Sequence, residues 1–296
     1  MVLDLTGTTG PENYYERLWS FIPKFIVMLT EIDLESKLRR SLPILFELLG
    51  ENYTHAQWDT INSNFIKVHN RREAESIKEP GKLFQVNLYS LIIAKEVHRS
   101  RTAFVFLDFL QRTLEELCDT LTPANKKELR RTLYQVLINF DHKYRNYFGE
   151  LLILNNAVKH GAHRLVKIES PITESKTADF LLENEKEGRV LVEVVNIHID
   201  DDRNDVKRFI AGKLEDKFIS KAGDQKNSKP FTIVPVIWAS HKQLRRLEAM
   251  YGSGDGIQVP FSCLPPCAYA TFDYDADRFI NKFGTITTLF KKFELS

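Results

Sequence analysis

The chain has 296 residues, of which 43% are hydrophobic and 27% charged, a balance typical of soluble globular proteins with room for two cores. Lys and Arg number 41 against 40 Asp and Glu, so the net charge of +1 argues neither for nor against nucleic acid, and any phosphate contact must come from a local basic patch. Three cysteines, no secretory signal and no run long enough to span a bilayer predict a cytoplasmic protein that does not bind membranes.

The first half of the chain, from Glu12 to about Phe140, has the apolar spacing of helices. A leucine stripe between Leu34 and Leu48 is interrupted by Pro43, which predicts a kink or a break, and Gly50 is a plausible stop. The run from Lys82 to Leu121 predicts two helices or one bent helix. We expect residues 1–140 to form an all-helical domain.

The apolar period changes after about Asp141. Lys143–His160 is expected to be a helix, and the pattern then alternates as in strands. A polar turn, Asn184–Gly188, joins two of these strands and predicts a hairpin. Expected strands are Arg164–Ile168, Thr177–Glu183, Arg189–Ile199, Phe231–Trp238 and Ala268–Phe272, and further helices are Asp205–Ala222, Lys242–Tyr251 and Asp275–Phe293. We therefore expect residues 141–296 to form an α/β domain with a mixed sheet flanked by helices.

Three acids stand at informative places in this order. Glu150 lies in the first helix, Asp179 in the second strand and Glu193 in the third. Strand alternation puts Asp179 opposite the face of Phe180, and Glu193 opposite the face of its valine neighbours. Because the two strands form a hairpin, both carboxylates are expected on a common face. An acid in so apolar a strand is costly to bury unless it is paired or bound to a cation.

This arrangement resembles the PD-(D/E)XK nuclease superfamily, directly over Lys143 to Trp238. The resemblance implies a restriction-endonuclease-like fold in which Asp179 and Glu193 hold Mg²⁺ or Mn²⁺, and Glu150 assists. The family motif places a lysine two residues after the second acid, but Val195 stands there. Some members supply the lysine from the following helix, which makes Lys213 and Lys217 candidates.

The helix after the third strand also has a phosphate-binding pattern. From Arg203 to Lys229 there are eight Lys or Arg against four Asp or Glu. Residues expected to contact a nucleic-acid backbone are Arg208, Lys213, Lys217 and Lys221. A solvated lysine face is the simpler alternative, as are an exposed Glu150 and a cross-strand ion pair at Asp179.

The sequence thus leaves three functional readings. The first is a Mg²⁺-dependent nuclease acting on DNA or RNA; family analogy suggests a bacterial defence, mobile-element or repair role. The second is a nuclease-like fold that has lost catalysis, as Val195 would allow, and that binds nucleic acid or assembles proteins. The third is a helical interaction protein with an unrelated α/β half. In each, the helical domain is open to substrate positioning, homodimer formation or a protein partner.

Overall fold

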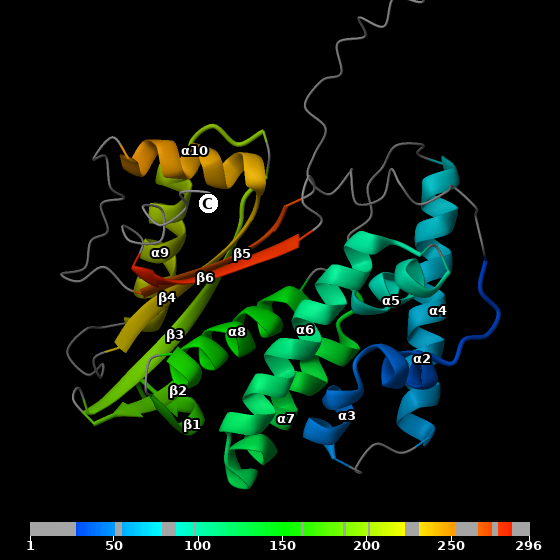
Figure 1. Cartoon of the computed structure of the whole chain (residues 1–296), viewed down its shortest axis with the longest axis horizontal. Coiled ribbons are helices and arrows are strands. Elements are labelled where there is room, and N and C mark those ends of the chain that lie inside the picture. The colour runs from blue at the N-terminus through cyan, green and yellow to red at the C-terminus, as the bar shows by residue number, and fades with distance from the viewer. Residues whose placement is uncertain are drawn as a thin grey trace, which may run out of the picture.

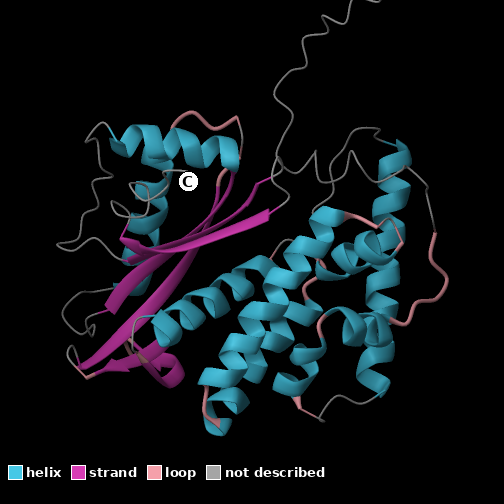
Figure 2. Ribbon diagram, in the orientation of Figure 1, coloured by secondary structure: helices cyan, strands magenta, loops and turns pink. Residues whose placement is uncertain are grey.

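Helices make up the first half of the protein in its computed structural model, and a mixed sheet dominates the second (Figure 1 and Figure 2). The structure describes residues 28–50, 55–78, 87–97, 99–141, 143–160, 163–185, 188–200, 202–222, 231–252, 266–273 and 278–285. The first part of the helical pattern, residues 12–27, and both ends of the expected closing helix, residues 275–277 and 286–293, lie outside these ranges. No helix in the described part of the chain is both long and apolar enough to cross a membrane.

The helical first half is confirmed. Pro43 occupies the first turn of a new helix, where its missing N–H costs no hydrogen bond, so the leucine stripe divides into two helices. Gly50 ends the second of them with φ at 72°. The run expected to give two helices or a bent one gives two. In chain order the helices are α2 (Leu34–Ser41), α3 (Pro43–Leu49), α4 (His55–Lys78), α5 (Leu88–Glu96), α6 (Arg101–Thr120) and α7 (Pro123–Ile138).

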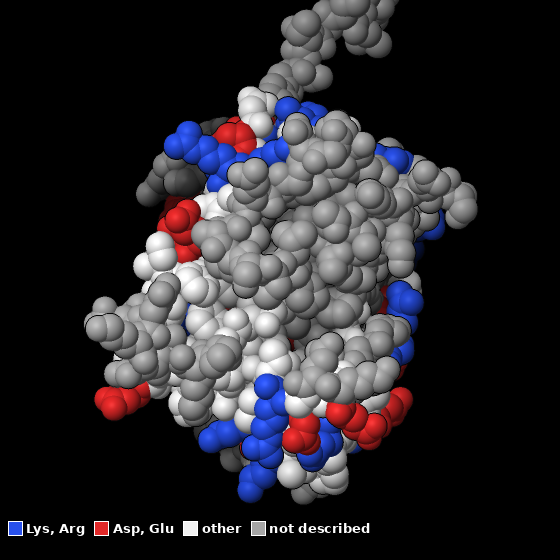
Figure 3. All heavy atoms as spheres, turned by 90° about the vertical axis from the view of Figure 1, so that its left-hand side faces the viewer, with Lys and Arg blue, Asp and Glu red and all other residues white. Residues whose placement is uncertain are grey.

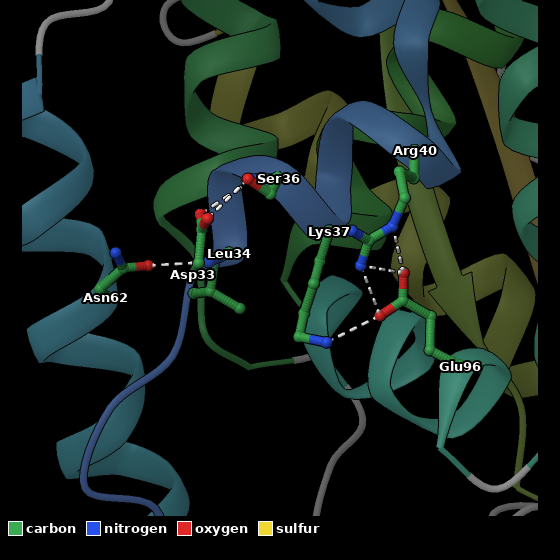
Figure 4. A network of polar contacts seen from close by, with 7 residues as sticks. All are labelled: Asp33, Leu34, Ser36, Lys37, Arg40, Asn62 and Glu96. Carbon is green, nitrogen blue, oxygen red and sulfur yellow. Dashed lines mark hydrogen bonds and ion pairs between the residues drawn. The ribbon is translucent and has the colours of Figure 1, made fainter.

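Polar contacts join three of these helices at the start of α2 (Figure 4). Asp33 caps α2 by accepting the Ser36 N–H, and Asn62 of α4 accepts the Leu34 N–H. Lys37 and Arg40 of α2 both bind the carboxylate of Glu96 in α5. We call Lys37, Arg40 and Glu96 the Glu96 cluster.

The second half is a six-stranded sheet within the described residues, in the order β1-β2-β3-β4-β5-β6. Pairing is antiparallel from β1 to β3, parallel from β3 to β5 and antiparallel between β5 and β6. The strands are β1 (Arg164–Pro171), β2 (Thr177–Asn184), β3 (Gly188–His198), β4 (Phe231–Ser240), β5 (Pro266–Asp273) and β6 (Arg278–Thr285), and the helices are α8 (Tyr144–His160), α9 (Val206–Ala222) and α10 (His241–Gly252). The expected mixed sheet flanked by helices is confirmed.

The sheet has two buried faces because β3 and β4 are covered on both sides. Val192 and Val194 of β3 face α8 and belong to an apolar core that continues into the helical half. Val195 and Ile197 face the other way, where Ile210 and other residues of α9 cover them. Figure 1 shows α8 between the sheet and the remaining helices, with α9 and α10 on the opposite side. Glu193 therefore belongs by alternation to the α9 face.

One expected element is wrong. Asp275–Phe293 was expected to be a closing helix, but residues 278–285 form β6, which pairs with β5 from Asp273↔Arg278 to Pro266↔Thr285. The segment contains Phe279, Ile280 and Phe283, which favour strands, and Gly284, which weakens a helix. β5 supplies the backbone hydrogen-bond partners of β6, and the local sequence pattern does not show that these partners exist.

Candidate active site

The backbone pairing of β2 with β3 ends at Phe180↔Val192, and Asp179 is the β2 residue immediately before Phe180. Its Oδ2 atom accepts the backbone N–H of Val194 at 2.7 Å. The carboxylate thus accepts a backbone N–H of β3 just beyond the last paired residues of the two strands. We call this place, where the backbone pairing of β2 with β3 ends and a side-chain contact replaces it, the fork. The contact holds the Asp179 carboxylate next to Glu193, as the shared-face prediction required.

Glu193 is completely buried, with 0% of its surface exposed. Its Oε1 atom lies 2.6 Å from the Lys217 ammonium and 2.9 Å from the Lys221 ammonium. These lysines are four residues apart on α9 and therefore lie on one side of that helix. Although both lysines form ion pairs with Oε1, neither carboxylate oxygen accepts a hydrogen bond from a described residue. A buried carboxylate without hydrogen-bond donors is costly, so this carboxylate is a candidate cation ligand.

Glu150 and Asp179 have raised pKa values because they are buried near other carboxylates. Burial raises the pKa of Glu150 well above its usual range, and the charges of Asp179 and Glu193 raise it further. The pKa of Asp179 rises to about 6, through burial and the charge of Glu193, against the opposing Val194 hydrogen bond. Each acid therefore favours a proton or a cation beside it. We call Glu150, Asp179, Glu193, Lys217 and Lys221 the Glu193 cluster.

Other residues named from the sequence lie elsewhere. The Lys213 side chain is exposed, and its ammonium lies 5.5 Å from the centroid of the Phe209 ring rather than at the acids. Arg208 is also exposed. Val195 is 9% exposed and packs in the apolar core against α9. In Figure 3 described Lys and Arg residues lie along the upper, right-hand and lower margins of one face, with Asp and Glu among them.

Two features of the site were not expected from the sequence. Lys221, expected only to contact phosphate, reaches Glu193; its i, i+4 spacing from Lys217 was the available signal. Glu169 of β1 stands between residues paired with Phe180 and Ala178, which puts it level with Asp179. It has φ at 50°, pairs with Arg131 of α7 and contributes to the raised pKa of Glu150. No sequence pattern marks that backbone conformation.

The donor set fits a hard divalent cation. Within the described residues, no group of three or more His, Cys, Asp or Glu side chains is arranged to hold a metal ion. Mg²⁺ does not need one, because it usually keeps several waters and binds one or two carboxylates together with substrate phosphate. Asp179 and Glu193 would supply those two carboxylates, and the Oε2 atom of Glu193 has no other partner among the described residues.

Comparison with known proteins adds no relative to this picture: no protein-family model, curated protein or solved structure matches the chain.

Proposed function

We propose that the protein is a metal-dependent phosphodiesterase with a PD-(D/E)XK, restriction-endonuclease-like domain, acting on DNA or RNA with Mg²⁺ or Mn²⁺. Support comes from the element order, in which α8 precedes three strands and α9 connects β3 to β4. The observation that carries the proposal is the buried Glu193, which contacts two lysines of α9 and lies beside Asp179 at the fork.

Each residue of the cluster has a role in this proposal. Asp179 and Glu193 hold the cation, which when bound supplies an activated water and neutralises charge at the phosphorus. Lys217, 29% exposed, orients that water from the α9 side. Glu150 keeps its proton to a higher pH than an ordinary glutamate and can donate a hydrogen bond to phosphate oxygens. Arg208 and Lys213, exposed on α9, contact the backbone of the nucleic acid.

The position of Val195 supports a relocated lysine rather than a lost one. A side chain at 195 shares the α9 face with Glu193, and Val195 fills that face with apolar packing against α9. The lysines of α9 approach the same carboxylate from the helix that covers Val195. A cationic group therefore reaches the second acid although the motif position is apolar.

The test is cleavage of single- and double-stranded DNA and RNA with Mg²⁺ or Mn²⁺. We expect Asp179→Asn and Glu193→Gln each to lower the rate by about 10³-fold or more, because each removes charge that binds the cation. Glu183→Gln is the matched control, since Glu183 is an acid of the same hairpin that is bound to Arg164 and Arg189 away from the cluster. Cleavage that persists without divalent metal, or survives Asp179→Asn, would refute the proposal.

A catalytically inactive nuclease-like module is the second candidate, favoured by the apolar Val195 at the motif position. It would bind nucleic acid or assemble proteins without cutting. The same assay separates the two, because this candidate predicts binding to nucleic acid with no cleavage of any substrate in either metal.

A further inference from the structure

The two lysines that contact Glu193 have different surroundings. Lys221 is 19% exposed; it donates a hydrogen bond to the backbone carbonyl of Thr177 at 2.6 Å and forms an ion pair with Oε1 of Glu193 at 2.9 Å. Lys217 forms an ion pair with Oε1 of Glu193 at 2.6 Å and donates no hydrogen bond to a described residue. An ammonium has three N–H donors, so Lys217 has more of its donors available for a ligand than Lys221 does.

The two contacts of Lys221 bridge the strands on either side of the fork. Thr177 is the first residue of β2 and pairs with Pro171 of β1, whereas Glu193 belongs to β3. Lys221 thus joins α9 to both strands of the hairpin at the point where their ladder has ended. Its ion pair with Oε1 also holds the carboxylate in place, and neither oxygen of that carboxylate has a hydrogen-bond partner among the described residues.

Lys217 makes the shorter contact with Glu193 and is the more exposed of the two lysines. Its ammonium lies 2.6 Å from Oε1 and its side chain is 29% exposed, against 2.9 Å and 19% for Lys221. A lysine that contacts the proposed metal ligand and stays partly open to solvent can reach the reacting water.

We infer that the two lysines divide the work of the motif lysine: Lys221 is a positioning residue that presents Glu193 to the metal, and Lys217 is the catalytic lysine. The inference rests on the proposed function. Residues that orient a metal ligand usually change metal affinity by about 10- to 100-fold, whereas a donor that acts directly on the reacting atoms changes the rate by about 10²- to 10³-fold.

The experiment measures Mn²⁺ affinity by calorimetry without nucleic acid, and the single-turnover cleavage rate at saturating Mn²⁺. Lys217→Met and Lys221→Met each delete one positive charge next to the same oxygen, so electrostatics alone predicts tighter Mn²⁺ binding for both. Division of roles predicts opposite results. Lys221→Met weakens Mn²⁺ binding by about 10-fold or more but cuts within about tenfold of the original rate when Mn²⁺ saturates. Lys217→Met keeps or tightens binding and loses about 10²-fold or more in rate.

Arginine variants distinguish positioning from general loss of structure. Lys221→Arg retains donors for both Thr177 and Glu193, so Mn²⁺ affinity should return to within about threefold. Lys217→Arg should restore little of the rate, because the larger, planar guanidinium presents its donors in a different geometry and does not orient the water as the ammonium does. Equal tightening of Mn²⁺ binding in both methionine variants, or no rescue by Lys221→Arg, would overturn the division.

The experiment distinguishes failure of the proposed nuclease function from failure of the division of roles between the two lysines. If the protein binds Mn²⁺ but cuts nothing, the nuclease proposal fails while the Mn²⁺ affinities still decide the role of Lys221. If it cuts and Lys221→Met binds Mn²⁺ as tightly as the original protein, the positioning role fails and the nuclease proposal stands. If it binds no Mn²⁺ at all, both are overturned.

Discussion

The Glu96 cluster and the Glu193 cluster have the same basic unit, a glutamate bound by two cations from one helix. In the Glu96 cluster the cations use both oxygens: Lys37 donates to Oε2 at 2.7 Å, and Arg40 donates to Oε1 at 3.1 Å (Figure 4). In the Glu193 cluster both lysines form ion pairs with Oε1, and neither carboxylate oxygen has a hydrogen-bond partner among the described residues. One glutamate is satisfied and the other is not.

The neighbouring charges separate the clusters further. Burial acts to raise the pKa of Glu96, but hydrogen bonds from Lys37 and Arg40 outweigh it and leave that pKa lowered. Around Glu193, the carboxyl groups of Glu150 and Asp179 have raised pKa values, which indicates that the two lysines do not fully compensate the negative charge of the three acids. The Glu96 cluster therefore stabilises the fold by itself, whereas the Glu193 cluster has the properties of a cation-binding site.

The largest difference should follow removal of both cations from each glutamate. Lys217→Met/Lys221→Met leaves the fully buried Glu193 uncompensated, and we expect the free energy of unfolding to fall by about 3–5 kcal/mol at pH 7. Lys37→Met/Arg40→Met exposes Glu96, 19% accessible already, to solvent and should cost about 1 kcal/mol. Urea denaturation measures both. Equal losses would mean that Glu193 is no more isolated from water than Glu96.

Asp179→Asn should stabilise the protein above pH 6. Between its ordinary pKa of 3.8 and its folded pKa of about 6, the folded protein retains a proton that the unfolded chain has lost. Stability of the original protein therefore falls as pH rises through this window, at a total cost of roughly 2–3 kcal/mol. The variant lacks this loss, so its advantage in urea titrations should grow from pH 4 to pH 6 and then level off. A variant that is less stable at pH 8 would contradict the raised pKa of Asp179.

The effect of Glu96→Gln on the free energy of unfolding should be opposite in sign to that of Asp179→Asn, and smaller. A lowered folded pKa contributes stability above the unfolded value of 4.5, and this contribution is lost as pH falls through the folded pKa. We expect a loss of about 1 kcal/mol at pH 7 that shrinks below about pH 4. Glu35→Gln is the surface control, because Glu35 forms an exposed i, i+4 pair with Arg39. If Glu96→Gln stabilised the protein, the two clusters would not differ in kind.

The sequence was sufficient to predict that Asp179 and Glu193 share a face of the sheet, but not how their carboxylates are held. Alternation predicts the shared face, because the period of a strand fixes which side each residue faces. In the structure Asp179 accepts the N–H of Val194, the residue after Glu193. The end of the β2–β3 ladder at Phe180 could not be predicted, since it depends on where two strands diverge in space. The same limit hid Glu169, whose position beside Asp179 follows from register.

The lysines show a second limit. Lys213, Lys217 and Lys221 are spaced by four on α9, and each step of four residues turns a helix by slightly more than one full turn. The three lysines therefore lie at slightly different angles around α9. Their position along the helix decides which of them can contact Glu193. The prediction of a helix at Asp275–Phe293 was wrong for a related reason. Residues 278–285 form the strand β6 because they pair with β5, and a local sequence pattern does not show such a partner.

The smallest expected effect is that of Lys213→Ala, which tests whether position along α9 decides function. Lys213 is exposed and does not contact Glu193, so its removal should change the free energy of unfolding by no more than about 0.5 kcal/mol. If it contacts phosphate, nucleic-acid binding should weaken for all sequences and the dependence of log affinity on log salt should lose about one unit of slope. Lys127→Ala, an exposed lysine on α7, is the matched control. A loss of cleavage rate at saturating substrate as large as that of Lys217→Met would show that Lys213 reaches the acids, because a phosphate contact that only binds is fully compensated by concentration.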